Sequence, residues 1–355
     1  MKINFSVIAV SLLMFVSACK KEDKPAVETP EVTTGVYVLN EGNFGANNTT
    51  LTYYSFSTNT PVTDYYQNAN GSGLGDTGND MLIYGGKAYI VMNVSSYVEV
   101  TDAFTAKNIK KIPIETTAGI KRQPRYAAAY KNKVLVTSYD GTVAVIDTTS
   151  LEVEKWIEVG TNPEGLVVSG DRLYVANSGG LSAEFDSTLS VVDLKTFEEL
   201  EKVMVGINPG AIAADNSGNI YVACAGNYAD VAPSLVKLNT SGNTIVAKAD
   251  TTVGKIKFYN GLLYTTGGYS GSPYVRTLNT TDFSQTGANF VTDGTTVTLP
   301  YGISIDEENG DVYVTDAKNF TNTGEVFCFD KTGKKKFSFS VSPGVSPNTV
   351  AIIRQ

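Results

Sequence analysis

The sequence predicts an all-β protein, a seven-bladed β-propeller closed by pairing of the C-terminal strand with the N-terminal blade. Short runs rich in Val, Leu and Tyr recur, separated by Gly, Asn, Asp and Ser, which is the pattern of strands joined by turns. One tripeptide pattern returns seven times at intervals of 39 to 52 residues, the spacing of four-stranded propeller blades. No first strand precedes the first copy of the tripeptide, and the C-terminal end of the chain has a first strand that no tripeptide follows. The two ends of the chain are therefore expected to complete one blade.

The repeat is clearest in the second strand of each blade, where Tyr is the central residue in six of seven copies. The seven tripeptides are Val36-Tyr37-Val38, Ala88-Tyr89-Ile90, Val134-Leu135-Val136, Leu173-Tyr174-Val175, Ile220-Tyr221-Val222, Leu263-Tyr264-Thr265 and Val312-Tyr313-Val314. Internal repeats bury their faces against each other, so residues 35–355 are predicted to form one closed domain.

A first strand precedes six of these tripeptides. The predicted first strands are residues 80–84, 125–130, 164–168, 210–214, 255–259 and 301–305, with 347–353 as the strand that completes the first blade. Prolines stand just before four of the seven, at Pro124, Pro163, Pro209 and Pro300, and Pro347 begins a fifth. Proline cannot donate to a strand ladder and therefore belongs at a strand start. Closing the ring leaves no strand edge open to aggregation.

The first 34 residues are predicted to be targeting and tether segments. Residues 1–18 carry Lys2, an apolar core from Phe5 to Val16 and small residues before Cys19, as a signal peptide does. The core is too short for a spanning helix. The segment ending at Cys19 resembles a lipobox, which implies lipidation of that thiol and a membrane contact through the lipid anchor only. Residues 19–34 are expected to form a flexible tether, and Lys21-Glu22-Asp23 within it resembles a surface-export signal of outer-membrane lipoproteins.

Composition excludes several classes of function. The chain has no histidine, which removes Ser-His-Asp and Cys-His triads and the commonest metal ligand. Its formal net charge of -8 argues against nucleic acid as a partner. Cys224 and Cys328 lie in predicted strands of different repeats and are expected to be free buried thiols. No metal site and no cofactor are predicted.

The candidate ligand-binding residues lie on one face of the ring, where the loops after second strands meet the junctions between blades. Long loops on a rigid ring are where binding residues usually lie. Aromatic side chains beside amides suit a large, flat, partly polar ligand. The candidates are Phe44, Asp80, Arg125, Tyr126, Tyr139, Phe185, Asn227, Tyr228, Tyr269, Tyr301 and Phe320.

Each candidate also has a structural explanation, because aromatic side chains hold loops together and Asn and Asp shape turns. Catalysis is not predicted. Two funnel carboxylates could act as acid and base, but the sequence singles out no such pair. Asn309-Gly310-Asp311 lacks the spacing of a calcium-binding loop.

From Gly35 to the end the chain resembles the YncE-like seven-bladed propellers. Gly35-Val-Tyr-Val-Leu-Asn-Glu-Gly-Asn-Phe-Gly45 and Gly75-Asp-Thr-Gly-Asn-Asp-Met81 are similar to a family of outer-membrane lipoproteins that includes BtuG-like vitamin B12-binding propellers. The resemblance implies a lipid-anchored, surface-exposed outer-membrane protein. It also implies binding of a corrinoid at the loop face and transfer of that ligand to a TonB-dependent transporter.

Two other functional classes stay open. One is a glycan- or peptide-binding propeller of another uptake system. The other is a calcium-dependent propeller lyase or lactonase, which would need clustered carboxylates in the funnel. A structural scaffold without a small-molecule ligand is a further possibility.

Overall fold

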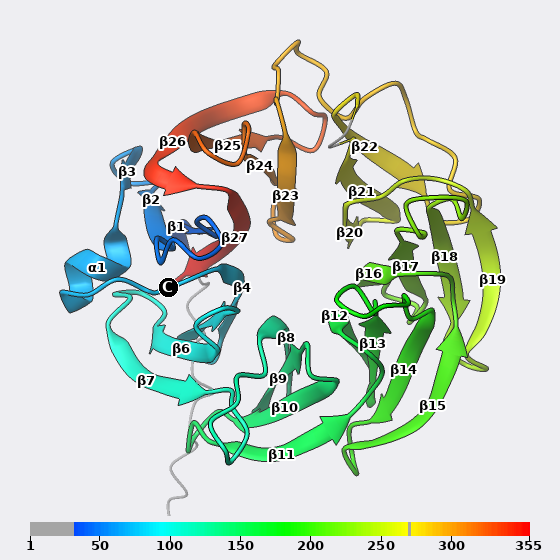
Figure 1. Cartoon of the computed structure of the whole chain (residues 1–355). Helices are drawn as coiled ribbons and strands as arrows, with labels where there is room; N and C mark the ends of the chain where they lie inside the picture. The colour runs from blue at the N-terminus through cyan, green and yellow to red at the C-terminus, as the bar shows by residue number, and fades with distance from the viewer. Residues whose placement is uncertain (1–31, 269–270) are drawn as a thin grey trace, which may run out of the picture. The chain divides into compact units, whose positions relative to one another are not determined.

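The computed structural model describes residues 32–268 and 271–355. Residues Thr33–Gln355 form one compact unit, a ring of seven antiparallel sheets around a central axis (Figure 1). We call the hollow along that axis, which inner-strand residues of the blades line, the channel. The predicted seven-bladed propeller is therefore confirmed. The predicted signal peptide, Cys19 and nearly all of the tether lie outside the described residues. No helix within the described ranges is long and apolar enough to cross a membrane.

Blade 1 is built from both ends of the chain, in the sheet order β27-β1-β2-β3. Its strands are β27 (Pro347–Arg354), β1 (Thr33–Asn40), β2 (Thr50–Ser55) and β3 (Thr60–Val62). Val38 pairs with Val350 and Tyr37 with Ala351. The predicted closure by the C-terminal strand is confirmed.

Blades 2 to 5 each have four strands in chain order from the channel outward. Blade 2 comprises β4 (Gly78–Tyr84), β5 (Lys87–Met92), β6 (Tyr97–Asp102) and β7 (Asn108–Pro113). Blade 3 comprises β8 (Pro124–Tyr130), β9 (Lys133–Ser138), β10 (Thr142–Asp147) and β11 (Val153–Glu158). Blade 4 comprises β12 (Pro163–Ser169), β13 (Arg172–Asn177), β14 (Thr188–Asp193) and β15 (Glu198–Met204). Blade 5 comprises β16 (Pro209–Ala214), β17 (Ile220–Cys224), β18 (Ser234–Asn239) and β19 (Thr244–Ala249).

Blade 6 departs from the predicted four strands, because its sheet has three. They are β20 (Lys255–Tyr259), β21 (Leu262–Gly267) and β22 (Tyr274–Asn279). Residues that follow β22 cover its outer edge irregularly, through bonds such as Phe290 N–H to Val275 C=O. Blade 7 again has four strands, β23 (Pro300–Ile305), β24 (Val312–Asp316), β25 (Thr323–Phe329) and β26 (Lys335–Val345). A six-residue helix that the sequence analysis did not predict, α1 (Tyr65–Asn70), lies between blades 1 and 2.

The core is divided among the seven blade interfaces, and the repeated tripeptide explains how. Tyr37 packs against blade 2 residues such as Met81, whereas its neighbours Val36 and Val38 pack against blade 7. Successive strand residues point to opposite faces, so one tripeptide serves two interfaces. Five of the six repeated tyrosines are less than 2% exposed, namely Tyr37, Tyr89, Tyr174, Tyr221 and Tyr313.

The two predicted thiols lie in this core. Cys224 on β17 and Cys328 on β25 are free and buried, as expected. Burial raises the pKa of each thiol to about 12. Both therefore act as small apolar side chains rather than as nucleophiles.

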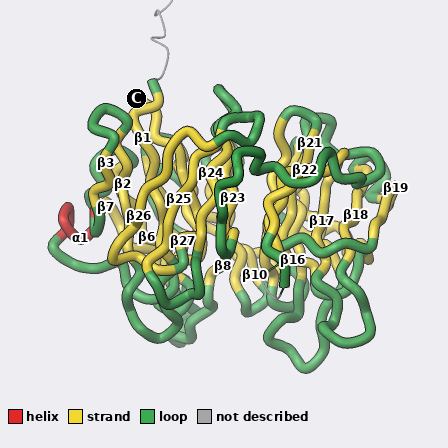
Figure 2. The backbone as a smooth tube through the Cα atoms, turned by 90° about the horizontal axis from the view of Figure 1, so that it is seen from above, coloured by secondary structure: helices red, strands yellow, loops and turns green. Residues whose placement is uncertain are grey.

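All seven inner strands begin at the same edge of the ring, and five of them begin at the predicted prolines. The loops after second strands end at that edge too, and we call it the loop face. In Figure 2 the loop face is the lower edge, and the C-terminus lies at the upper edge. The inner strands approach each other closely. A Cβ on Gly165 would lie 2.6 Å from the carbonyl oxygen of Gly210, so glycine is required there.

Candidate ligand-binding site

The channel mouth at the loop face is built from bulges in the inner strands. Six of the seven inner strands carry an extra residue near their start, and β20 does not. A bulge re-aims side chains at the rim of a barrel or sheet. The first bulge residues are Asn79, Arg125, Glu164, Gly210, Tyr301 and Asn348.

One side of the mouth is closed by an ion pair. Arg125 donates from Nε to Glu164 Oε2 at 3.1 Å and from Nη2 to Glu164 Oε1 at 3.2 Å, and it also donates to Asn79. Tyr139 donates to the same carboxylate, and its ring lies 4.6 Å from the guanidinium carbon of Arg125. Burial opposes the charge on Arg125, but the nearby Glu164 carboxylate raises its pKa overall. For Tyr139 it is burial itself that raises the pKa of the hydroxyl, because burial disfavours the charged phenolate. We call Asn79, Arg125, Tyr139 and Glu164 the closed sector.

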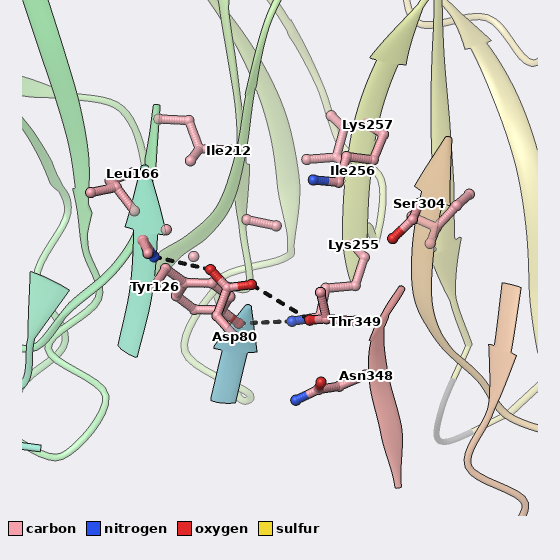
Figure 3. Close-up of a pocket in the computed structure, with 15 residues that line it drawn as sticks. Asp80, Tyr126, Leu166, Ile212, Lys255, Ile256, Lys257, Ser304, Asn348 and Thr349 are labelled. Atoms are coloured by element: carbon pink, nitrogen blue, oxygen red, sulfur yellow. Dashed lines mark hydrogen bonds between the residues drawn. The ribbon is translucent and has the colours of Figure 1, made fainter. Parts of the chain in front are cut away.

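Two predicted residues, Asp80 and Tyr126, line a cavity of about 150 Å³ just inside the mouth (Figure 3). Lys255 Nζ donates to the Tyr126 hydroxyl oxygen at 2.7 Å. Asp80 Oδ2 accepts the Ala127 N–H at 3.0 Å, and its Oδ1 receives a long 3.5 Å contact from Thr349 Oγ1. Burial raises the pKa of Asp80. We call Gly165, Gly210, Ala211 and Lys255, which line this cavity from blades 4, 5 and 6, the open sector.

Tyr301 and Phe320 occupy a third part of the mouth. Their rings meet edge to face with centroids 5.2 Å apart. The Tyr301 hydroxyl donates to Glu41 Oε2 at 2.7 Å, and burial raises the pKa of that hydroxyl. The backbone carbonyl of Phe320 accepts from Asn43 at 2.7 Å. Blades 1 and 7 are thereby tied together across the loop face.

Phe185 and Tyr228 form a second aromatic pair on the loops of blades 4 and 5. Their ring centroids lie 5.8 Å apart, edge to face. Tyr228 is 78% exposed, and its hydroxyl accepts from Asn208, in the junction that leads to Gly210. Phe44, on the blade 1 loop, is 84% exposed. These aromatic faces are open to a ligand.

The remaining candidates have other positions. Asn227 accepts the N–H groups of Ala229 and Val231 through Oδ1 and donates to Asp230, which is the role of a turn-shaping residue. Tyr269 lies outside the described residues.

The structure also places Glu41, Lys255 and Asn348 at the mouth, and none of these three was among the sequence-based candidates. Lys255 and Asn348 stand at the starts of predicted inner strands, as Arg125 and Tyr301 do, so the same rule would have found them.

No group of three or more Cys, Asp or Glu side chains in the described ranges is arranged to hold a metal ion. The chemistry on the loop face is that of aromatic surfaces, amides, hydroxyls and a few paired charges. Such groups bind by stacking and hydrogen bonding.

Comparison with known proteins gives the family. A model described as a domain of unknown function, DUF5074, matches residues 34–344. The chain belongs to the DUF5074 family. No curated protein matches it significantly.

Solved structures share the fold at low sequence identity. A quinonprotein alcohol dehydrogenase-like protein from Bacteroides thetaiotaomicron matches with a TM-score of 0.66 at 13% identity, over 90% of this chain and 78% of that one. Hydrazine synthase from Kuenenia stuttgartiensis matches with a TM-score of 0.60 at 16% identity, over 72% and 76%. The computationally designed Ika8 protein matches with a TM-score of 0.56 at 12% identity, over 90% and 91%. At these identities the likeness establishes the propeller fold of this DUF5074 protein and nothing about its ligand.

Proposed function

We propose that this DUF5074 propeller is a binding protein that captures a corrinoid on its loop face and passes it to a TonB-dependent outer-membrane transporter. It acts by binding rather than catalysis and is held at the cell surface by a lipid on Cys19. Localisation and partner rest on the sequence resemblances alone. The binding proposal has support from the arrangement of side chains on the loop face.

The observation that carries the proposal is the exposed apolar surface of the loop face. Six of the fourteen exposed large apolar side chains in the described residues lie in loops after second strands or in blade junctions, namely Phe44, Ile120, Leu181, Tyr228, Val231 and Phe320. They include the four most exposed of the fourteen, with Phe44 at 84% and Tyr228 at 78%. Exposed apolar side chains that lie together with others mark an interaction site, and Tyr228 lies against the ring of Phe185. A corrinoid offers a broad apolar ring for such contacts and amides at its edge for the polar groups between them.

Calorimetric titration of cyanocobalamin into the chain from Thr33 to Gln355 tests the proposal. We expect one-to-one binding and a melting temperature that rises with the concentration of free ligand. Absence of heat and of stabilisation with both cyanocobalamin and cobinamide would contradict it. A glycan array would then test the alternative class of ligand.

A further inference from the structure

The channel cavity beside the open sector is lined by both hydrogen-bond donors and acceptors. Its polar side chains are those of Asp80, Tyr126, Lys255, Lys257, Ser304, Asn348 and Thr349 (Figure 3). The Tyr126 oxygen accepts from Lys255, which leaves its own hydrogen to donate. Asp80 Oδ1 receives the 3.5 Å contact from Thr349, at the limit of a hydrogen bond, and has room for a better donor.

The cavity presents charges of both signs. The Asp80 carboxylate attracts donors and the Lys255 and Lys257 ammonium groups attract acceptors, so a guest with one full charge pairs with one kind of group and faces repulsion from the other. A purely apolar guest would cover these polar groups without bonding to them, which costs free energy. The fitting end group is uncharged and carries both an acceptor and a donor. A primary carboxamide has both.

The apolar walls of the cavity indicate which kind of linker connects the end group to the rest of the ligand. Leu166, Ala211, Ile212, Ile256 and Ile303 line the same cavity with apolar surface. A short methylene stem matches that surface, whereas a sugar ring would set hydroxyls against it. The volume of about 150 Å³ accommodates one small arm and excludes a whole macrocycle.

The entrance lies at Gly210. A Cβ built on Gly210 meets no atom within 4 Å, in contrast to Gly165 on the neighbouring strand. Gly210 also follows the junction that contains Asn208, which bonds Tyr228 on the exposed aromatic pair. The exposed aromatic pair is thereby bonded to the junction two residues before Gly210.

We propose that the cavity receives one neutral carboxamide arm of the ligand, with Lys255 and Tyr126 donating to its carbonyl oxygen and Asp80 accepting from its amide nitrogen. The proposal deepens the proposed function and rests on it for the identity of the ligand. It also makes a claim about the cavity itself that small probes test separately.

The first test uses Gly210→Leu, whose side chain would fill the entrance. The backbone of Gly210 lies outside the left-handed region that only glycine favours, so the change is expected to leave the melting temperature unchanged. Cyanocobalamin affinity is expected to fall at least tenfold. The matched control is Gly242→Leu, in the turn between β18 and β19, whose Cβ has ordinary contacts at 3.8 Å or more. It is expected to bind as the wild type does.

The second test uses saturation-transfer NMR with propionamide, propionate and propylammonium on the wild-type protein and on Gly210→Leu. We expect transfer to propionamide alone, lost in the variant. Lys255→Met keeps the stem without the charge and is expected to weaken propionamide and cyanocobalamin binding in parallel. This variant decides the matter if Gly210→Leu fails to fold.

The two proposals fail in different ways. Cyanocobalamin binding that is equal in the wild type, Gly210→Leu and Lys255→Met would overturn the cavity inference and leave corrinoid capture standing. Propionamide binding without any corrinoid binding would overturn corrinoid capture and support the cavity. Equal transfer to propionate and propionamide would overturn the neutral-arm assignment.

Discussion

The closed and open sectors of the channel mouth differ in how far their polar groups bind each other. In the closed sector the carboxylate of Glu164 is shared by Arg125 and Tyr139, so the chain's own groups satisfy each other. Beside the open sector the Asp80 carboxylate borders a cavity of about 150 Å³, and Gly210 stands where the other bulges carry larger side chains. The difference teaches that a charged group at a propeller mouth is not in itself a ligand contact. Its existing partners decide whether it stabilises the fold or remains for a guest.

The largest expected effect comes from breaking the closed sector. Glu164→Leu removes the carboxylate that accepts from both Arg125 and Tyr139, which are largely buried, and leaves the guanidinium with the neutral Asn79 amide as acceptor. Because removing one partner of a buried pair strands the other, we expect a loss of about 2–4 kcal/mol in the free energy of unfolding. Urea denaturation measures it. The double variant Arg125→Met, Glu164→Leu is expected to recover part of that loss, and additive losses would show that the pair is not coupled.

A second, intermediate effect is expected on binding without an effect on stability. Tyr228→Ala removes an exposed ring, so the melting temperature should stay within about 1 °C while cyanocobalamin affinity falls about tenfold, or about 1.4 kcal/mol. Phe104→Ala is the matched control, since Phe104 is an exposed aromatic residue in the turn between β6 and β7, away from the loop face. Equal losses in the two variants would rule out a specific site on the loop face.

The smallest expected effect has the opposite sign to that of Glu164→Leu. The folded-state pKa of Asp80 is raised by burial, so folding favours its protonated form. Its contribution to stability is fully present below about pH 4, the pKa of an unfolded aspartate, and is lost as the pH rises through the folded-state pKa. Asp80→Asn removes this loss and should raise the urea midpoint at pH 7 while leaving it little changed below pH 4. A lower urea midpoint for Asp80→Asn at pH 7 would show that the Asp80 carboxylate stabilises the fold and is not held at a cost in stability for binding a ligand.

The fold was predictable because it repeats. Each Tyr-centred tripeptide reports on two blade interfaces, so seven copies with consistent spacing define the ring even where one copy has Leu135 instead. Blade 6 shows the limit of this rule. The polar stretch after β22 carries no strand pattern, and the edge is covered through scattered backbone bonds that sequence does not reveal.

The positions of the candidate residues on the ring were predictable, but their pairings were not. Long polar loops placed the candidates on one face, and Phe185 and Tyr228 were both among them. Their contact depends on blades 4 and 5 being neighbours at a fixed angle, which follows from ring closure and not from local sequence. Tyr301 and Glu41 are 260 positions apart in the chain, yet share a hydrogen bond for the same reason. Arg125 was a reasonable candidate contact, because nothing in its own strand shows that Glu164 already holds it.

The pairing of β1 with β27 makes the starting point of this propeller arbitrary. Thr33 lies opposite Arg354, so the first and last strands leave the ring beside each other. A circular permutant that joins these two ends through a short flexible linker and opens the chain at another turn of the same edge, such as the one at Gly242, keeps every strand pairing described above. Such a protein would present the same loop face from a different point of attachment.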